Sequence, residues 1–220
     1  MTEIIVTCII ALFSLALGAA IARYQSLMKE RSVRVILPKN TRELLFGIGM
    51  IVSVAAIVLC LNLVYDSSVI AAAKRIVLCS VLWPIALIDF RKHIIPNKIL
   101  IVLLIIRAII LIPEFALDLQ TAKKESISAL IACFGTVILL CIMRLAVKNG
   151  IGFGDIKLFG VIGLYLGLQG IVTSVFLSFV VSFLVSVFLL ASKRKSKKDQ
   201  LALAPSILVG TILSVVFFGA

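Results

Sequence analysis

The chain has 220 residues, of which 62% are hydrophobic, and a mean hydropathy of +1.25. This composition excludes an ordinary soluble globular domain, because several apolar stretches reach the roughly 18 to 20 residues that cross the ~30 Å hydrocarbon core of a bilayer. A net charge of +12 would suit a nucleic-acid-binding protein, but the positive residues lie between the apolar stretches. We therefore expect a membrane protein that binds lipid and no nucleic acid.

The apolar stretches predict an all-α, polytopic membrane protein with about eight transmembrane helices. Runs of this length without β alternation must be helical, because lipid cannot satisfy exposed backbone groups. The predicted spans are 4–22, 44–65, 76–88, 99–112, 127–147, 156–168, 171–191 and 201–218. The third, fourth and sixth of these are short, so their ends are the least well defined.

The distribution of positive charge predicts the orientation of the chain. The turns at 23–42, 91–98, 144–157 and 193–198 hold 17 of the 22 Lys and Arg residues. The intervening turns hold only Lys74, Arg75, Lys123 and Lys124, and Arg107 lies inside the fourth span. Because positive residues accumulate on the cytoplasmic side, the pattern predicts that both termini lie outside. Attraction of anionic lipid head groups is an alternative reason for the basic turns.

We expect one integral-membrane domain over residues 1–220. Its N-terminal spans (1–75) would include a basic cytoplasmic turn at 23–43, and residues 76–220 would form the catalytic helical core. The first span carries Glu3 in place of a positive n-region, which favours a retained anchor over a cleaved signal peptide. All five cysteines lie in apolar spans and none forms a C-x-x-C pair, so we expect no metal site and no disulfide framework.

Two acidic residues stand apart from the other eight. Asp89 and Asp155 each lie where an apolar stretch meets a basic turn, and an acid at a membrane edge is a functional candidate by default. The alternative to a functional role for Asp89 is a structural one, in which it is an acid at a helix end whose charge is balanced by neighbouring positive residues. Asp155 follows Gly152 and Gly154, and glycines allow unusual backbone angles or a close approach of another segment. The structural alternative is that these glycines serve only a tight entry into the helix.

The charge-based topology places both acids at cytoplasmic ends, on the third and sixth spans. If these helices pack together, the two carboxyl groups can flank one water molecule and share one proton, because close like charges do not ionise together. One carboxylate would then act as a base toward water while the protonated carboxyl polarises a peptide carbonyl. The sequence does not assign these two roles to particular residues.

The chain resembles the type IV prepilin peptidase family, which are membrane aspartic proteases of the Gly-x-Gly-Asp kind. The resemblance rests on Asp89 followed by Ile95-Pro96-Asn97, and on the segment from Gly152 through Gly154, Asp155 and Lys157 to Leu158. The interval between the two motifs and the number of predicted spans also agree with the family. The segment 203–208 is similar to a C-terminal proline-containing segment of the family.

The resemblance implies an endopeptidase of the prokaryotic cytoplasmic (inner) membrane, without a cofactor. Its substrate would be a prepilin or pseudopilin, cleaved between a short basic leader and a hydrophobic helix at the cytoplasmic face. Asp89 and Asp155 match the catalytic pair, and Gly152, Gly154, Lys157, Pro96 and Asn97 match the supporting motifs.

Two alternatives stay open. Bifunctional relatives methylate the new N-terminus and carry paired C-x-x-C motifs after the first span, whereas the turn 23–42 has no cysteine. A proton-coupled transporter, the alternative from another class, would need acids near the middle of the membrane. The sequence does not identify the particular substrate or the oligomeric state.

Overall fold

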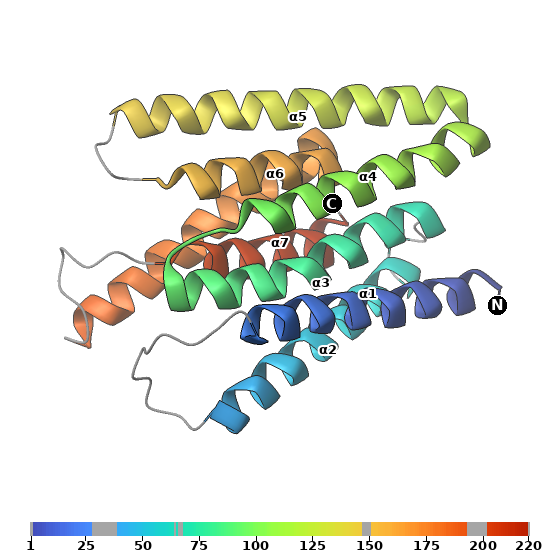
Figure 1. Cartoon of the computed structure of the whole chain (residues 1–220). Helices are drawn as coiled ribbons and strands as arrows, with labels where there is room; N and C mark the ends of the chain where they lie inside the picture. The colour runs from blue at the N-terminus through green and yellow to red at the C-terminus, as the bar shows by residue number, and fades with distance from the viewer. Residues whose placement is uncertain are drawn as a thin grey trace.

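A computed structural model describes residues 2–27, 39–63, 65, 68–146, 151–192 and 202–219. Its helices, in chain order, are α1 (Thr2–Leu27), α2 (Lys39–Leu63), α3 (Val69–Lys92), α4 (Asn97–Leu117), α5 (Leu119–Ala146), α6 (Phe153–Ala191) and α7 (Ala204–Phe218). They lie side by side in one bundle (Figure 1). The described part of the chain contains no strand, which confirms the all-α prediction.

Four of the described helices, α3 to α6, are long and apolar enough to cross a membrane. Their outward faces carry large apolar side chains such as Phe134, Ile138 and Leu145 on α5, which are more than half exposed. Side chains of this kind suit contact with lipid. The chain is therefore a membrane protein, as predicted.

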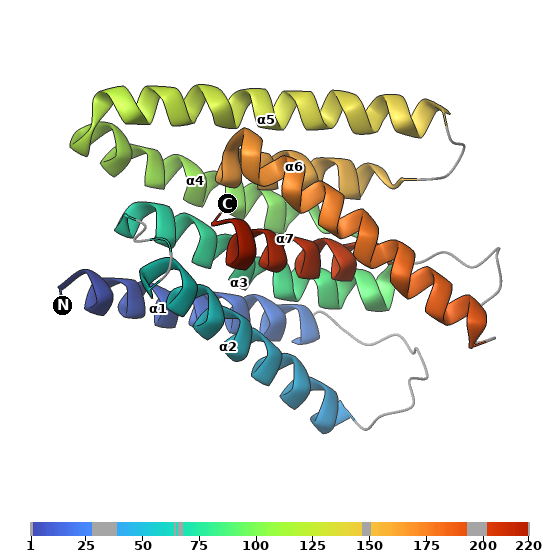
Figure 2. The same ribbon diagram turned by 180° about the vertical axis from the view of Figure 1, so that it is seen from behind.

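The sixth and seventh predicted spans form the single element α6, which reverses direction at Gly167. This residue has φ 69° and ψ −170°, in a region that is essentially restricted to glycine. Figure 2 shows the first arm of α6 (153–166) running away from the start of the helix and the second arm (168–191) returning. The two arms give the direction changes expected of two spans, while the count of eight crossings stays a prediction.

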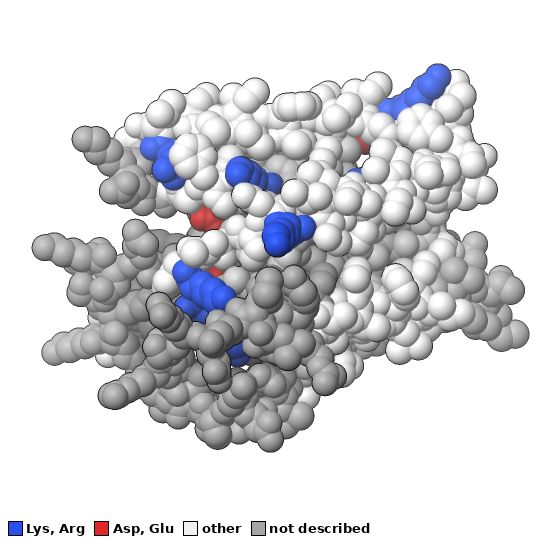
Figure 3. All heavy atoms as spheres, in the orientation of Figure 1, with Lys and Arg blue, Asp and Glu red and all other residues white. Residues whose placement is uncertain are grey.

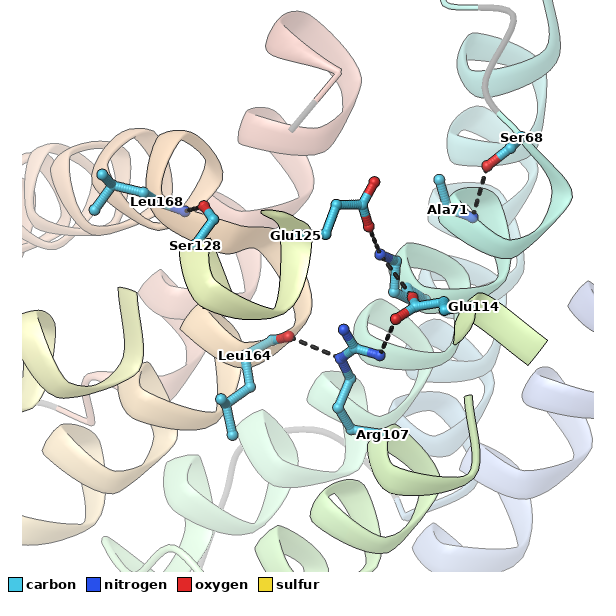
Figure 4. A network of polar contacts seen from close by, with 9 residues as sticks. Ser68, Ala71, Arg107, Glu114, Glu125, Ser128, Leu164 and Leu168 are labelled. Carbon is cyan, nitrogen blue, oxygen red and sulfur yellow. Dashed lines mark hydrogen bonds and ion pairs between the residues drawn. The ribbon is translucent and has the colours of Figure 1, made fainter. Parts of the chain in front are cut away.

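Two side chains replace the backbone hydrogen bond that this reversal removes. In an unbroken helix the N–H of Leu168 would donate to the carbonyl of Leu164. Here the Leu168 N–H donates to Ser128 Oγ on α5 (3.1 Å), and Arg107 Nε on α4 donates to the Leu164 carbonyl (2.8 Å) (Figure 4). Because lipid offers no substitute partner, the neighbouring helices hold the reversal in place.

The observed helices extend beyond several predicted spans. α3 covers Val69–Lys92 where 76–88 was predicted, and α4 covers Asn97–Leu117 where 99–112 was predicted. Lys74 and Glu114 therefore lie inside helices and are only 7% exposed, although the sequence analysis placed both outside the spans. Their ion pair, 2.9 Å from Nζ to Oε1, offsets the cost of burying each charge and lets both helices continue.

α3 is the central helix and contacts α1, α2, α4, α6 and α7. One buried cluster joins it to α4, α6 and α7 through residues such as Leu82, Ile85, Phe159 and Ile207. A second cluster joins it to α1 and α2. The core thus fixes the C-terminal end of α3 relative to the start of α6.

Two glycines in the first arm of α6 allow close packing against α5. A Cβ at Gly160 would lie 2.8 Å from Val137 Cγ2, and one at Gly163 would lie 3.0 Å from the Ala132 carbonyl carbon, both on α5.

The bundle has two chemically different ends. At one end, which we name the dyad end after Asp89 and Asp155, α3 ends and α4, α6 and α7 begin. At the other end, the reversal end, α6 turns back, α4 meets α5, and the first and last described residues lie (Figures 1 and 2). Both termini therefore lie at the same end, and their placement outside the cell stays a prediction. The basic turn 193–198 and residues 28–38 of the turn 23–43 lie outside the described residues.

Candidate active site

Asp89 lies in the last turn of α3 and is 5% exposed. Its Oδ2 accepts a hydrogen bond of 3.0 Å from the backbone N–H of Ala204, the first residue of α7. The free N–H groups at a helix N-terminus carry partial positive charge and attract anions. The start of α7 therefore supplies a favourable partner for a buried carboxylate that has left water.

Asp155 lies in the first turn of α6 and is half-buried. Its Oδ2 accepts a hydrogen bond of 3.2 Å from the backbone N–H of Gly152, the residue that precedes the helix. The side chain thus folds back over the start of its own helix, which favours negative charge at this position.

α3 and α6 contact each other, and the charge of Asp89 acts on the carboxyl group of Asp155. Figure 3 shows acidic atoms recessed between basic side chains at the dyad end. The fold therefore brings together two acids that lie 66 positions apart in the sequence, one carboxyl being buried and the other half-buried.

The two glycines of the Gly-x-Gly-Asp motif are favoured by limited space and not by backbone conformation. Gly152 has φ −73° and ψ 147°, an extended conformation that any residue adopts, and Gly154 has no positive φ either. A Cβ at Gly152 would lie 2.8 Å from Asp155 Oδ2, and one at Gly154 would lie 3.1 Å from Ile95 Cβ. The expectation of unusual backbone angles is wrong here. The expected close approach of another segment is confirmed at Gly154, which lies against Ile95.

The other motif residues meet across α4 and α6. Asn97 opens α4, and its Oδ1 accepts a hydrogen bond from Lys157 Nζ at 3.4 Å. Pro96 is at the N-cap of α4, with φ −71°. The Asn97–Lys157 contact ties the start of α4 to the first turn of α6, which carries Asp155.

The sequence analysis missed two groups that shape this site. Arg144, assigned only to the charge pattern, donates to the Ile151 carbonyl and lies 4.0 Å above the centre of the Phe153 ring. It therefore fixes the segment that leads into α6. The Ala204 backbone donor lies in the 203–208 segment that the family resemblance had singled out, but no side-chain pattern reveals a backbone contact.

The arrangement suits general acid–base chemistry. Two carboxyl groups with helix N-terminal partners can share one proton and present one ionised oxygen to a water molecule. Within the described residues, no group of three His, Cys, Asp or Glu side chains is placed to hold a metal ion.

Comparison with known proteins identifies the family. The model of the type IV leader peptidase family matches residues 76–189, just over half of the chain. The chain belongs to the type IV leader peptidase family. This confirms the resemblance noted from the motifs, and all seven residues predicted for the site lie within the matched range.

A curated relative supports the same grouping. The chain is 30% identical over 142 residues to the prepilin leader peptidase/N-methyltransferase of Bacillus subtilis (strain 168), and the alignment covers 64% of this chain and 54% of the relative. The chain thus spans about half the length of that relative. No solved structure shows significant similarity to the chain.

Proposed function

We propose that the chain is a membrane aspartic endopeptidase that cleaves the short basic leader from type IV prepilins or prepilin-like proteins. Cleavage takes place at the cytoplasmic face of the inner membrane, where Asp89 and Asp155 activate a water molecule. The observation that carries the proposal is the meeting of these two acids at the dyad end, each in its family motif.

In the proposed reaction, the ionised carboxylate removes a proton from water while the protonated carboxyl donates a hydrogen bond to the oxygen of the scissile peptide. The new C–O bond gives a tetrahedral intermediate. The C–N bond of the intermediate then breaks. The leaving nitrogen receives the proton that the ionised carboxylate had earlier taken from water. Either aspartate can fill either role, because the pair titrates as a unit.

The position of the acids along the bundle fits such a substrate. A prepilin joins a polar, basic leader to an apolar helix, so its cleavage site lies where the membrane begins. Asp89 and Asp155 lie at helix ends and not at the middle of the bundle, where a proton-coupled transporter would need them. The buried acid farther along the bundle, Glu114, is already paired with Lys74 and Arg107.

The decisive experiment is incubation of the purified chain with a purified prepilin, followed by mass spectrometry of the product N-terminus. Asp89→Asn and Asp155→Asn should each abolish cleavage, while both variants remain inserted and folded. Asp118→Asn is the matched control, because it removes a carboxylate that is exposed at the α4–α5 junction, and it should cleave normally. Robust processing by either dyad variant would refute the proposal.

The same spectra decide between a peptidase and a peptidase with N-methyltransferase activity. With S-adenosylmethionine present, a methylated product N-terminus would establish the second activity. We expect an unmethylated product, because the turn 23–42 lacks the cysteine pairs of bifunctional relatives.

A further inference from the structure

The segment that leads into α6 contributes a backbone group to the candidate dyad. The N–H of Gly152 donates to Asp155 Oδ2 at 3.2 Å, and Gly152 is the residue that precedes the helix. The place of the Asp155 carboxyl group therefore depends on the direction in which this N–H points.

The Gly152 N–H belongs to the same peptide group as the carbonyl of Ile151. The described residues contain no cis peptide bond, and in a trans peptide the C=O and the N–H lie in one plane and point in opposite directions. Arg144 Nη1 donates to the Ile151 carbonyl. One planar group thus joins Arg144 on one side to Asp155 on the other, and a partner that fixes the carbonyl also fixes the direction of the N–H.

The contact with Arg144 also strengthens this N–H as a donor. A hydrogen bond from a guanidinium to a carbonyl is charge-assisted, and hydrogen bonds that follow one another in a chain polarise each other. The positive charge of Arg144 draws electron density toward the Ile151 oxygen. The Gly152 N–H therefore becomes a stronger donor to the Asp155 carboxyl group.

Arg144 holds the same segment at a second point. Its guanidinium carbon lies 4.0 Å from the centre of the Phe153 ring. A planar guanidinium can stack on an aromatic face and donate hydrogen bonds in its own plane at the same time, which a lysine ammonium cannot do. With Ile151 held on one side and Phe153 on the other, Gly152 lies between two contacts to one side chain.

The helix that carries Arg144 is itself packed closely against α6. Arg144 lies in the last turn of α5. Gly160 and Gly163 bring the first arm of α6 against Val137 and Ala132 of α5, with too little room for a Cβ on either glycine. Arg144 is therefore presented at a defined place beside the start of α6.

We propose that Arg144 is a positioning residue for Asp155, which it orients through the Ile151–Gly152 peptide group. The inference rests on the proposed function, in which Asp155 is one of the two acids that activate water. An oriented donor holds the carboxyl group in the geometry that this reaction requires. Direct contact with the substrate is not part of the role, and the charge of Arg144 would repel a basic leader.

The alternative role for Arg144 is a general one at the end of a helix. A cation in the last turn interacts favourably with the helix dipole, and lysine would serve this purpose as well as arginine. The substitution Arg144→Lys separates the two roles, because it keeps the charge and loses the planar guanidinium.

The first test compares the cleavage of a purified prepilin by wild type, Arg144→Lys, Arg144→Gln and Phe153→Leu. Arg144→Gln should lower kcat by about 10²-fold, the other two variants should show part of that loss, and KM should stay unchanged. The matched control is Arg91→Lys, at an exposed position in the last turn of α3, which should keep the wild-type kcat. Wild-type kcat in Arg144→Lys, or a change in KM alone, would overturn the proposal. Phe153→Leu leaves every charge in place, so its kcat decides the matter if the Arg144 variants do not fold.

A second test does not depend on cleavage. Labelling with 15N-glycine reports on only 13 residues, and Gly152→Ala identifies the amide signal of Gly152. The amide proton of Gly152 should move upfield in both Asp155→Asn and Arg144→Gln, because each change weakens its hydrogen bond. The signal of Gly135, which has open space around it, should not move.

The two tests together separate this inference from the proposed function. An unmoved Gly152 signal in Arg144→Gln would overturn the positioning role, whatever the cleavage rates are. If the signal moves but the wild-type chain cleaves no prepilin, the contact from Arg144 to Asp155 is supported and the proposed function is refuted.

Discussion

Asp89 Oδ2 accepts the backbone N–H of Ala204 at 3.0 Å, across 115 positions of sequence. One member of the candidate dyad is thus held by the first residue of the last helix. Ala204 lies beyond the range 76–189 that the family model matches, so the site depends on a part of the chain outside that range.

We expect Asp89→Glu to lower the rate of prepilin cleavage by about 10²-fold. The substitution keeps the charge but lengthens the side chain by one methylene. The carboxylate then cannot both keep the Ala204 hydrogen bond and stay in place beside Asp155. Single-turnover cleavage rates measure this effect, and thermal unfolding in detergent checks the fold. Wild-type rates would show that charge alone suffices at this position.

Gly152→Ala should lower cleavage by about 10²-fold with little change in stability. The backbone at this position, φ −73° and ψ 147°, accepts alanine without strain. The added Cβ would lie 2.8 Å from Asp155 Oδ2 and displace that carboxylate. Gly135→Ala is the control, because no atom lies within 4 Å of its added Cβ. Normal cleavage by Gly152→Ala would contradict the spatial reason for this glycine.

Gly160→Ala and Gly163→Ala should both destabilise the fold, by about 1–3 kcal/mol, but only the first can be rescued. Alanine at 160 would meet the Val137 side chain, whereas alanine at 163 would meet the backbone of Ala132. Adding Val137→Ala should therefore restore much of the stability of Gly160→Ala and none of that of Gly163→Ala. Unfolding midpoints of the single and double variants in micelles measure the coupling. Equal rescue of both would show that α5 and α6 do not approach in this way.

Arg107→Leu should destabilise the protein by about 3–5 kcal/mol, because it leaves Glu114 with one cation fewer in a buried site. Glu114→Leu should have a similar effect on Arg107, since both side chains are 6% exposed. The double variant should be more stable than the sum of the two losses predicts, because no charge of this pair is left behind. Equilibrium unfolding of the four proteins gives the coupling energy. Strict additivity would mean that the pair does not interact.

Hydropathy was enough to predict the all-helical membrane fold, in which four of the described helices are long and apolar enough to cross a membrane. It predicted residues 156–168 and 171–191 as two spans. These correspond approximately to the two arms of the single element α6, which reverses at Gly167. Hydropathy also began the third span after Lys74 and ended the fourth before Glu114, although both residues lie inside helices. Hydropathy scores each charge alone, whereas their pairing forms only in the folded bundle.

The candidate site was predictable to a similar extent. The family motifs identified Asp89, Asp155, Gly152 and Gly154, because such motifs are defined by residue type and spacing. The partners of the carboxylates were not predictable, because the Ala204 N–H is a backbone group and its direction depends on how α7 begins.

The one-residue reversal at Gly167 also bears on how the chain is made. The two arms of α6 have no hydrophilic loop between them that could be translocated separately, and Leu168 and Gln169 are the exposed residues next to the break. Residues 153–191 are therefore suited to enter the bilayer together, as a helical hairpin, during synthesis. A tag or protease site inserted at this point would disrupt assembly of the polypeptide instead of reporting its orientation.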